Sequence, residues 1–155
     1  MKPVVKKATP AAIAVLRQAT ALFPKRNKAS DGLLPSAAHL NQNPNSDHNT
    51  GFAVDLTHDS AFGINGHEVY EHLKSDKRVK YLIFKGRIWS AEKGDCDYTG
   101  ANKHNKHVHI SIKDNCGTDT SNWFPWLGKP TTINKVKAAV QPKPKKKENQ
   151  WTRRS

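Results

Sequence analysis

The sequence is poor in cysteine, which limits how it can be held together. It has two cysteines in 155 residues, Cys96 and Cys116. A bond between them would close a loop worth about 3 kcal/mol. No export signal is evident, however, and a chain made in a reducing compartment keeps its thiols. The sequence therefore argues against a disulfide framework, and we expect both cysteines to be free.

Long hydrophobic runs are also missing. The longest apolar run, residues 11–16, ends at Arg17, whereas a membrane-spanning helix needs about 20 apolar residues. The sequence argues against a spanning helix, stable membrane insertion and a cleaved signal peptide. A length of 155 residues predicts one compact domain.

Acidic residues are half as numerous as basic ones, with 13 against 26, and the net charge is +13. Residues 129–155 carry +8 of it and are rich in Pro, Lys and Gln. Such a composition predicts a folded domain over residues 1–128 and a basic, disordered tail over residues 129–155. An excess of Lys and Arg indicates an anionic partner: nucleic acid, an acidic membrane surface or a phosphate-rich cell wall.

Turn residues and hydrophobic spacing predict a mixture of helices and strands. Thr9 and Pro10 are typical of a helix start, and Pro24 of the end of that helix. Residues 25–50 are rich in Asn, Ser, Pro and Asp and predict a long loop with one helical turn at residues 36–40. The remaining predicted elements are strand 51–57, helix 66–76, a hairpin of residues 79–84 and 87–90, a polar segment at 94–106, strand 107–112, and an aromatic cap on the core at Trp123, Phe124, Trp126 and Leu127.

One carboxylate and two histidines are predicted to lie on the polar faces of strands. Phe52, Val54 and Leu56 alternate with Asp55, so Asp55 should face away from the core. His48 lies seven residues before Asp55, in the loop that leads into its strand. His104, His107 and His109 form a His-x-x-His-x-His array that runs into another strand, where His107 and His109 project to the same face because side chains repeat every two residues. Two imidazoles and one carboxylate provide three zinc ligands and leave a fourth position for water, as in hydrolytic zinc sites.

Each of these residues has an ordinary alternative. A lone histidine near a strand end is more often at the surface or in a hydrogen bond than on a metal, and Asp55 alone would be a strand residue that faces water. Their joint placement is what favours a metal site. The other histidines lack that placement and are predicted to be ordinary, with the last two solvated: His39, His58, His67 and His72.

A motif at residues 46–56 carries a family resemblance. The segment Ser46-Asp47-His48-Asn49-Thr50-Gly51-Phe52-Ala53-Val54-Asp55-Leu56 resembles the Ser-x-His-x-x-Gly-x-Ala-x-Asp signature of a group of zinc peptidases. That group includes D-Ala-D-Ala carboxypeptidases, phage L-alanyl-D-glutamate endolysins and the more distant hedgehog domain. His107-Val108-His109 is similar to the His-x-His that closes their site, and His104 with that pair resembles the murein endopeptidases. Residues 78–88 look like phage-encoded members. The resemblance covers residues 34–112.

The resemblance implies an α+β fold, with a small antiparallel sheet flanked by helices, and a zinc held by His48, Asp55 and His109. Gly51 and Ala53 would leave space for a peptide to approach the metal. Many members place a carboxylate three residues before the last zinc histidine as general base, but this chain has Lys106 there.

No carboxylate occurs between Gly100 and Ile112, so the proton must be handled by another group. His104 and His107 are the available substitutes, because an imidazole can take a proton near neutral pH. We expect His107 to act as a base or hydrogen-bonding group. We expect His104 to act as a base or to stabilise the transition state.

The leading hypothesis is a monomeric, endolysin-like zinc peptidase that cuts an amide of peptidoglycan. It would be made in the host cytoplasm and act on the cell wall after release, or be carried on a virion. Its basic tail would bind anionic envelope polymers or lipid head groups. The alternatives are a metal-dependent phage nuclease and a non-enzymatic envelope or nucleic-acid binding module. The sequence does not distinguish endopeptidase from carboxypeptidase.

Overall fold

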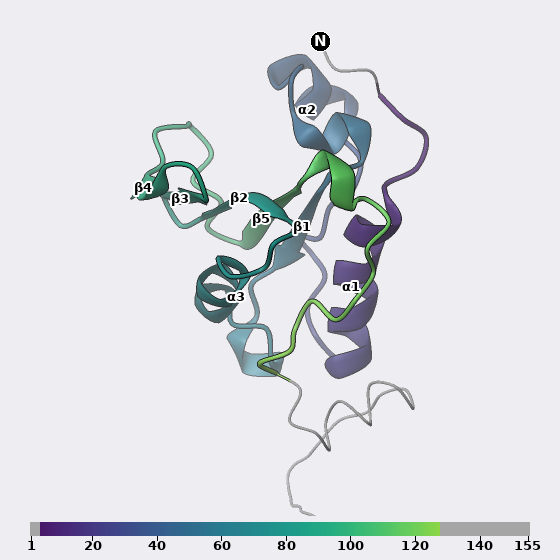
Figure 1. Ribbon diagram of the computed structural model, residues 1–155, viewed down its shortest axis with the longest axis vertical. Helices are drawn as coiled ribbons and strands as arrows, with labels where there is room; N and C mark the ends of the chain where they lie inside the picture. The colour runs from purple at the N-terminus through teal and green to yellow at the C-terminus, as the bar shows by residue number, and fades with distance from the viewer. Residues whose placement is uncertain (1–3, 128–155) are drawn as a thin grey trace, which may run out of the picture.

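A five-stranded antiparallel sheet forms the centre of the computed structural model, which describes residues 4–127. The strands follow the order β1-β5-β2-β3-β4 and have the bounds Ala53–Thr57 (β1), Val79–Phe84 (β2), Arg87–Ser90 (β3), Gly94–Asp97 (β4) and His107–Ile112 (β5). The α+β class with an antiparallel sheet flanked by helices is confirmed (Figure 1). The predicted basic tail, residues 129–155, lies outside the described residues.

Within the described residues, three α-helices and three short 3-10 helices surround the sheet. Their bounds are Pro10–Leu22 (α1), Ala37–Gln42 (α2), Asp47–Thr50 (η1), Ser60–Phe62 (η2), Gly66–Leu73 (α3) and Asp114–Cys116 (η3). As predicted, α1 begins after Thr9, whose side chain accepts a hydrogen bond from the Ala12 amide. Helix α3 ends three residues before the predicted boundary, because the amides of Ser75 and Asp76 donate to carbonyls only three residues back, those of His72 and Leu73, and so close the last turn.

Strand β4 lies within the segment 94–106, which was predicted as polar without any strand. It pairs with β3 in antiparallel register, and ion pairs join Arg87 of β3 to Asp95 and Asp97 of β4. All of the side chains that β4 contributes after Gly94 are exposed. A strand without buried apolar residues has no hydrophobic alternation to reveal it.

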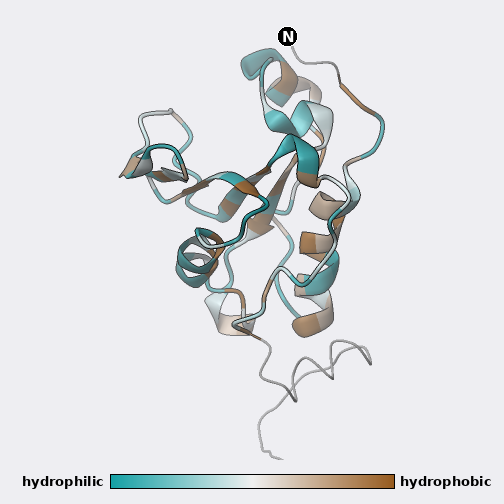
Figure 2. Cartoon of the chain, in the orientation of Figure 1, coloured by the Kyte–Doolittle hydropathy of each residue, from teal (hydrophilic) through white to brown (hydrophobic). Residues whose placement is uncertain are grey.

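The core lies between one face of the sheet and helices α1 and α3. Figure 2 shows hydrophobic residues along the central strands and on α1, where the two layers meet. The buried side chains include Val15, Leu22, Val54, Leu56, Val69, Leu73, Leu82, Val108, Ile110, Trp123 and Phe124. Trp126 and Leu127 pack against this core, which confirms the predicted aromatic cap. Cys96 and Cys116 are both free, as expected.

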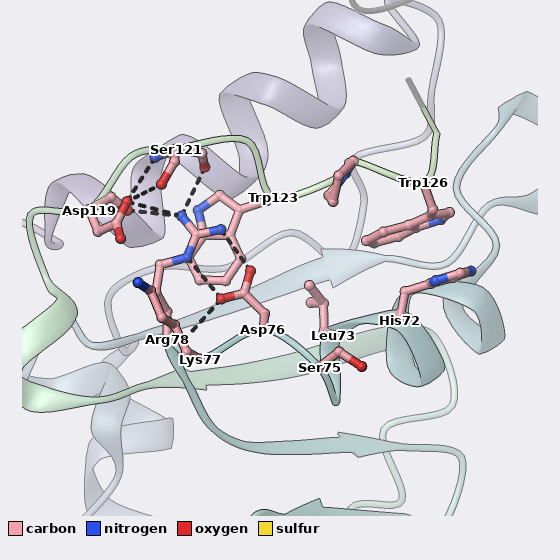
Figure 3. Close-up of a pocket in the computed structure, with 11 residues that line it drawn as sticks. His72, Leu73, Ser75, Asp76, Lys77, Arg78, Asp119, Ser121, Trp123 and Trp126 are labelled. Carbon is pink, nitrogen blue, oxygen red and sulfur yellow. Dashed lines mark hydrogen bonds and ion pairs between the residues drawn. The ribbon is translucent and has the colours of Figure 1, made fainter. Parts of the chain in front are cut away.

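A buried arginine, Arg78, connects the segment after η3 to the sheet through hydrogen bonds. The Arg78 guanidinium lies 3.5 Å from the centre of the Trp123 ring. It donates to the Asp76 carboxylate at 2.7 and 3.0 Å and to the carbonyls of Asp119 and Ser121 (Figure 3). A pocket of about 420 Å³ lies beside this group. Because Arg78 has these partners within the chain, its role here is structural.

Replacing Trp123 with alanine should destabilise the fold by about 3–5 kcal/mol, since its ring is fully buried and its Nε1–H donates to the Ala11 carbonyl. Urea unfolding measures this change. Trp89 is half-buried on β3, so Trp89→Ala serves as a control with a smaller expected loss. Equal losses for the two variants would contradict this account of the core.

Among residues 4–127, none of the helices has the length and apolar character needed to cross a membrane.

Candidate metal centre

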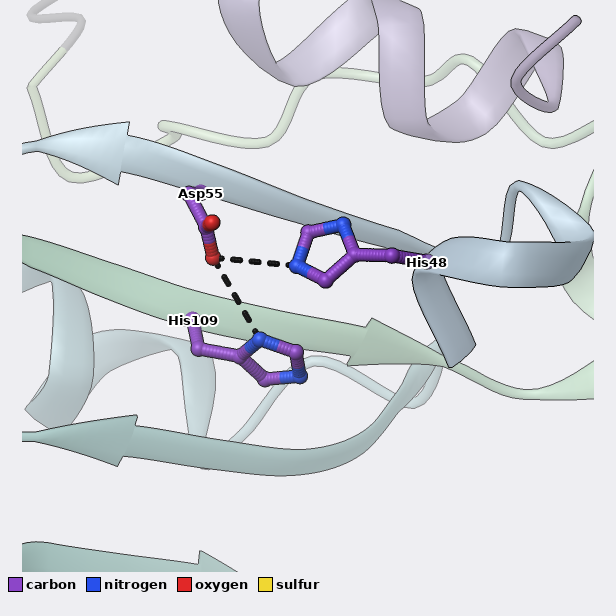
Figure 4. A group of neighbouring side chains, drawn as sticks. All are labelled: His48, Asp55 and His109. Atoms are coloured by element: carbon purple, nitrogen blue, oxygen red, sulfur yellow. Dashed lines mark hydrogen bonds and ion pairs between the residues drawn. The ribbon is translucent and has the colours of Figure 1, made fainter. Parts of the chain in front are cut away.

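Pairing of β1 with β5 places Asp55 directly opposite His109. Val54 and Leu56 of β1 face the core, so Asp55 projects from the other side of the sheet, as predicted from the alternation. His107 lies two residues before His109 and shares that side. His48 comes from η1, which precedes β1. From η1, the His48 ring points toward the Asp55 carboxylate (Figure 4).

Three side chains converge on one point. Asp55 Oδ1 lies 3.2 Å from His48 Nε2 and 3.3 Å from His109 Nδ1. One ligand atom from each residue lies within 4.8 Å of the others. Both histidines are buried, and Asp55 is partly buried. This group of His48, Asp55 and His109 could hold a metal ion.

Hydrogen bonds behind the rings determine which nitrogens face the carboxylate. His48 Nδ1 lies 2.7 Å from the Leu33 carbonyl, which can only accept, so Nδ1 carries the proton. Nε2 then faces Asp55, with a lone pair when the ring is neutral and with an N–H donor when the ring is protonated. His109 Nε2 lies 2.8 Å from the buried Ser111 hydroxyl, and His109 Nδ1 faces Asp55. A proton or a metal ion between the Asp55 carboxylate and these ring nitrogens would offset the negative charge, so this donor set fits a metal ion.

The same geometry shifts the pKa values of His48 and Asp55. Burial alone would lower the pKa of His48, but the hydrogen bond and charge of Asp55 outweigh it and raise that pKa above the ordinary value. Burial would raise the pKa of Asp55, but hydrogen bonds from His109 and His48 hold it well below the usual range. Asp55 is therefore an anion at neutral pH, as a metal ligand must be.

His107 and His104 lie beside the group without belonging to it. His107 Nε2 lies 3.6 Å from Asp55 Oδ1. The His104 ring centre lies 5.0 Å from that of His107 and 5.6 Å from that of His109. Burial lowers the pKa of both side chains, to about 4 for His104, which also lies near His109 and His107. Both imidazoles are thus favoured as neutral groups at pH 7. Lys106, which stands where a carboxylate was expected, is exposed.

Several residues near the group were not singled out from the sequence. Tyr81 stacks on His109 with ring centres 5.3 Å apart. Its position opposite Ser111 in the pairing of β2 with β5 follows from strand alternation, so the pattern could have revealed it. Gly32 pairs with Asp55 through backbone hydrogen bonds. No motif marks that contact, because it uses only main-chain atoms.

The four histidines predicted to be ordinary have different surroundings. His67 and His72 are exposed, as expected, and His72 stacks on Trp126. His58 Nδ1 accepts a hydrogen bond from the Gly66 amide. His39 bonds the Ser46 hydroxyl, and its ring lies edge-on to His48 with centres 5.4 Å apart. His39 therefore borders the group.

The explanation given for Gly51 and Ala53 was wrong. Gly51 has a φ of 78°, and a Cβ there would lie 2.8 Å from the Ala8 Cα. It is needed for the turn between η1 and β1 and for close packing of the segment before α1. Ala53 is fully buried. Neither residue opens a path to the metal group.

Comparisons with known proteins place the chain in a family. The family model described as the VldE C-terminal domain matches residues 5–109. This match covers well over half of the chain and contains all three residues of the metal group. Searches of curated proteins and of solved structures found no match. The chain belongs to the VldE C-terminal domain family.

Proposed function

We propose that this protein is a zinc-dependent peptidase that hydrolyses an amide bond in the peptide part of peptidoglycan. The observation that carries the proposal is the convergence of His48, Asp55 and His109 on one point, with His107 and His104 beside it. The resemblance of residues 46–56 to a zinc peptidase signature supports the same activity.

Zinc is the metal that suits these donors best. Imidazole nitrogens and one carboxylate oxygen are typical of catalytic zinc sites with three protein ligands, whereas magnesium and calcium prefer oxygen ligands alone. When bound, zinc polarises the scissile carbonyl and lowers the pKa of a water molecule to about 7. The protein contributes the position of the ligands and the groups that move protons.

We assign proton transfer to His107 and transition-state stabilisation to His104. His107 Nε2 lies at the edge of the centre, 3.6 Å from the Asp55 carboxylate, where a neutral imidazole can accept a proton from the attacking water and return it to the leaving amine. His104, with its pKa lowered to about 4, stays neutral at pH 7 and can donate a hydrogen bond to the developing oxyanion.

Digestion of purified peptidoglycan tests this function. The expected result is release of soluble muropeptides, which stops on addition of a chelator and returns with zinc. Mass spectrometry of the products identifies the bond that is cut. Zinc-dependent cleavage of DNA with intact peptidoglycan would favour the nuclease alternative, and no cleavage of either would favour a binding module.

A further inference from the structure

A segment of the loop before α2 runs along the outer edge of β1, next to the metal group. Gly32 donates its amide hydrogen to the Asp55 carbonyl at 3.1 Å and accepts from the Asp55 amide at 2.8 Å. These two bonds lie on the side of β1 opposite β5. The segment therefore adds one strand-like pairing at the position of the carboxylate ligand.

The same segment contacts two of the three metal-binding side chains. The Leu33 carbonyl accepts the hydrogen bond from His48 Nδ1 at 2.7 Å, and so sets the tautomer of that ring. A Cβ on Gly32 would lie 3.1 Å from Asp55 Oδ2, so the bare backbone of Gly32 is what lies against the carboxylate. A shift of residues 32 and 33 would move the Asp55 carboxylate and break the hydrogen bond that orients the His48 ring.

A buried ion pair holds this segment in place. Arg26 donates to both oxygens of Asp31, at 2.6 and 3.1 Å. Asp31 Oδ1 also accepts from the Thr57 hydroxyl at 2.7 Å and from the Thr57 amide at 3.1 Å. Arg26 itself donates to the Thr20 hydroxyl, close to the end of α1. Asp31 thus joins the region after α1 to the end of β1, immediately before Gly32.

From these contacts we propose that Arg26 and Asp31 are positioning residues for the metal centre. Neither belongs to the three-residue group; they act through Gly32 and Leu33, which orient Asp55 and His48. The inference rests on the metal site of the proposed function, but not on the substrate. Loss of an outer partner of this kind typically weakens metal affinity about 10- to 100-fold.

The chain contains a matched control for this pair. Arg78 and Asp76 form a second buried ion pair, 2.7 Å long against 2.6 Å for Arg26 and Asp31. The aspartate side chain is 14% exposed in both pairs, and the arginine is 1% or 4% exposed. Asp31→Asn removes the anion of Arg26, and Asp76→Asn removes the nearer of the two anions of Arg78, whose second partner is Asp119 at 3.5 Å. Both substitutions should therefore lower thermal stability.

Zinc affinity of the full chain, measured by competition with a chelator at a temperature where each variant is folded, distinguishes the pairs. Asp31→Asn should raise the Kd for zinc about 10- to 100-fold, while Asp76→Asn should leave it unchanged. Gly32→Ala keeps both ion pairs and should also raise the Kd for zinc, because the added methyl group would press on the Asp55 carboxylate. This variant serves as the test if Asp31→Asn does not fold. Unchanged affinity in the folded Asp31→Asn or Gly32→Ala variant, or equal weakening by Asp76→Asn, would overturn the proposal.

A metal-free readout separates this inference from the proposed function. In the wild-type protein at pH 9, nitrogen NMR should find the His48 proton on Nδ1, and Asp31→Asn or Gly32→Ala should shift the ring toward a mixture of tautomers. A protein that binds zinc as expected but leaves peptidoglycan intact would end the peptidase proposal alone. An unchanged His48 tautomer in both variants would end the positioning proposal, whether or not zinc binds.

Discussion

His48→Ala is expected to remove zinc and peptidoglycan hydrolysis together. The substitution deletes one of three protein ligands, so zinc affinity should fall by much more than the 10- to 100-fold typical of an outer partner. Asp55 Oδ1 would also lose its 3.2 Å contact with the ring. Elemental analysis of dialysed protein and the rate of muropeptide release measure the two losses.

His67→Ala is the matched control for this experiment. His67 is an exposed histidine on α3, and its replacement should change neither zinc content nor hydrolysis. Full zinc occupancy in His48→Ala would remove His48 from the site. Parallel losses in both variants would indicate that the zinc lies elsewhere.

His107→Ala is expected to keep zinc but lower turnover by about 10²- to 10⁴-fold, because it removes the group to which we assign proton transfer. Zinc should remain, since His48, Asp55 and His109 are still present. His104→Ala should also retain zinc and lose turnover if it donates to the transition state. Zinc content and initial rates on a soluble muropeptide separate these effects.

The two single variants also test the division of roles. If His107 is the base, an exogenous imidazole or another small base should partly restore the activity of His107→Ala, and should restore less in His104→Ala. Wild-type rates in both variants would contradict the assignment of proton transfer to these histidines. Loss of zinc in His107→Ala would instead make His107 a ligand.

The convergence of His48, Asp55 and His109 could be predicted because these residues follow local patterns. Asp55 and His109 lie on strands whose alternation determines their faces, and the pairing of β1 with β5 brings those faces together. His48 was noted for its position seven residues before Asp55, and the motif at residues 46–56 then singled it out as a ligand. The sequence contained no comparable sign of Gly32 and Leu33, because they contact the group through backbone atoms alone.

The fold was predictable where burial produces a pattern, and not where polar contacts replace it. Helix α1 and strand β2 have apolar residues at regular spacing, and their bounds agree with those expected. Strand β4 pairs with β3 through its backbone and has ion pairs to Arg87, but it buries no apolar side chain. The end of α3 is set by a tight backbone turn at Ser75 and Asp76. Gly51 was recognised in the motif, but glycine is required there because of its positive φ and its close approach to Ala8.

Anomalous diffraction at the zinc absorption edge, from crystals of the zinc-loaded protein, tests the central claim most directly. The metal centre predicts a peak about 2.0–2.2 Å from His48 Nε2, an Asp55 carboxylate oxygen and His109 Nδ1. It also predicts that His104 and His107 lie outside the coordination sphere. A zinc bound by His104 and His107 instead, or no peak among His48, Asp55 and His109, would contradict it.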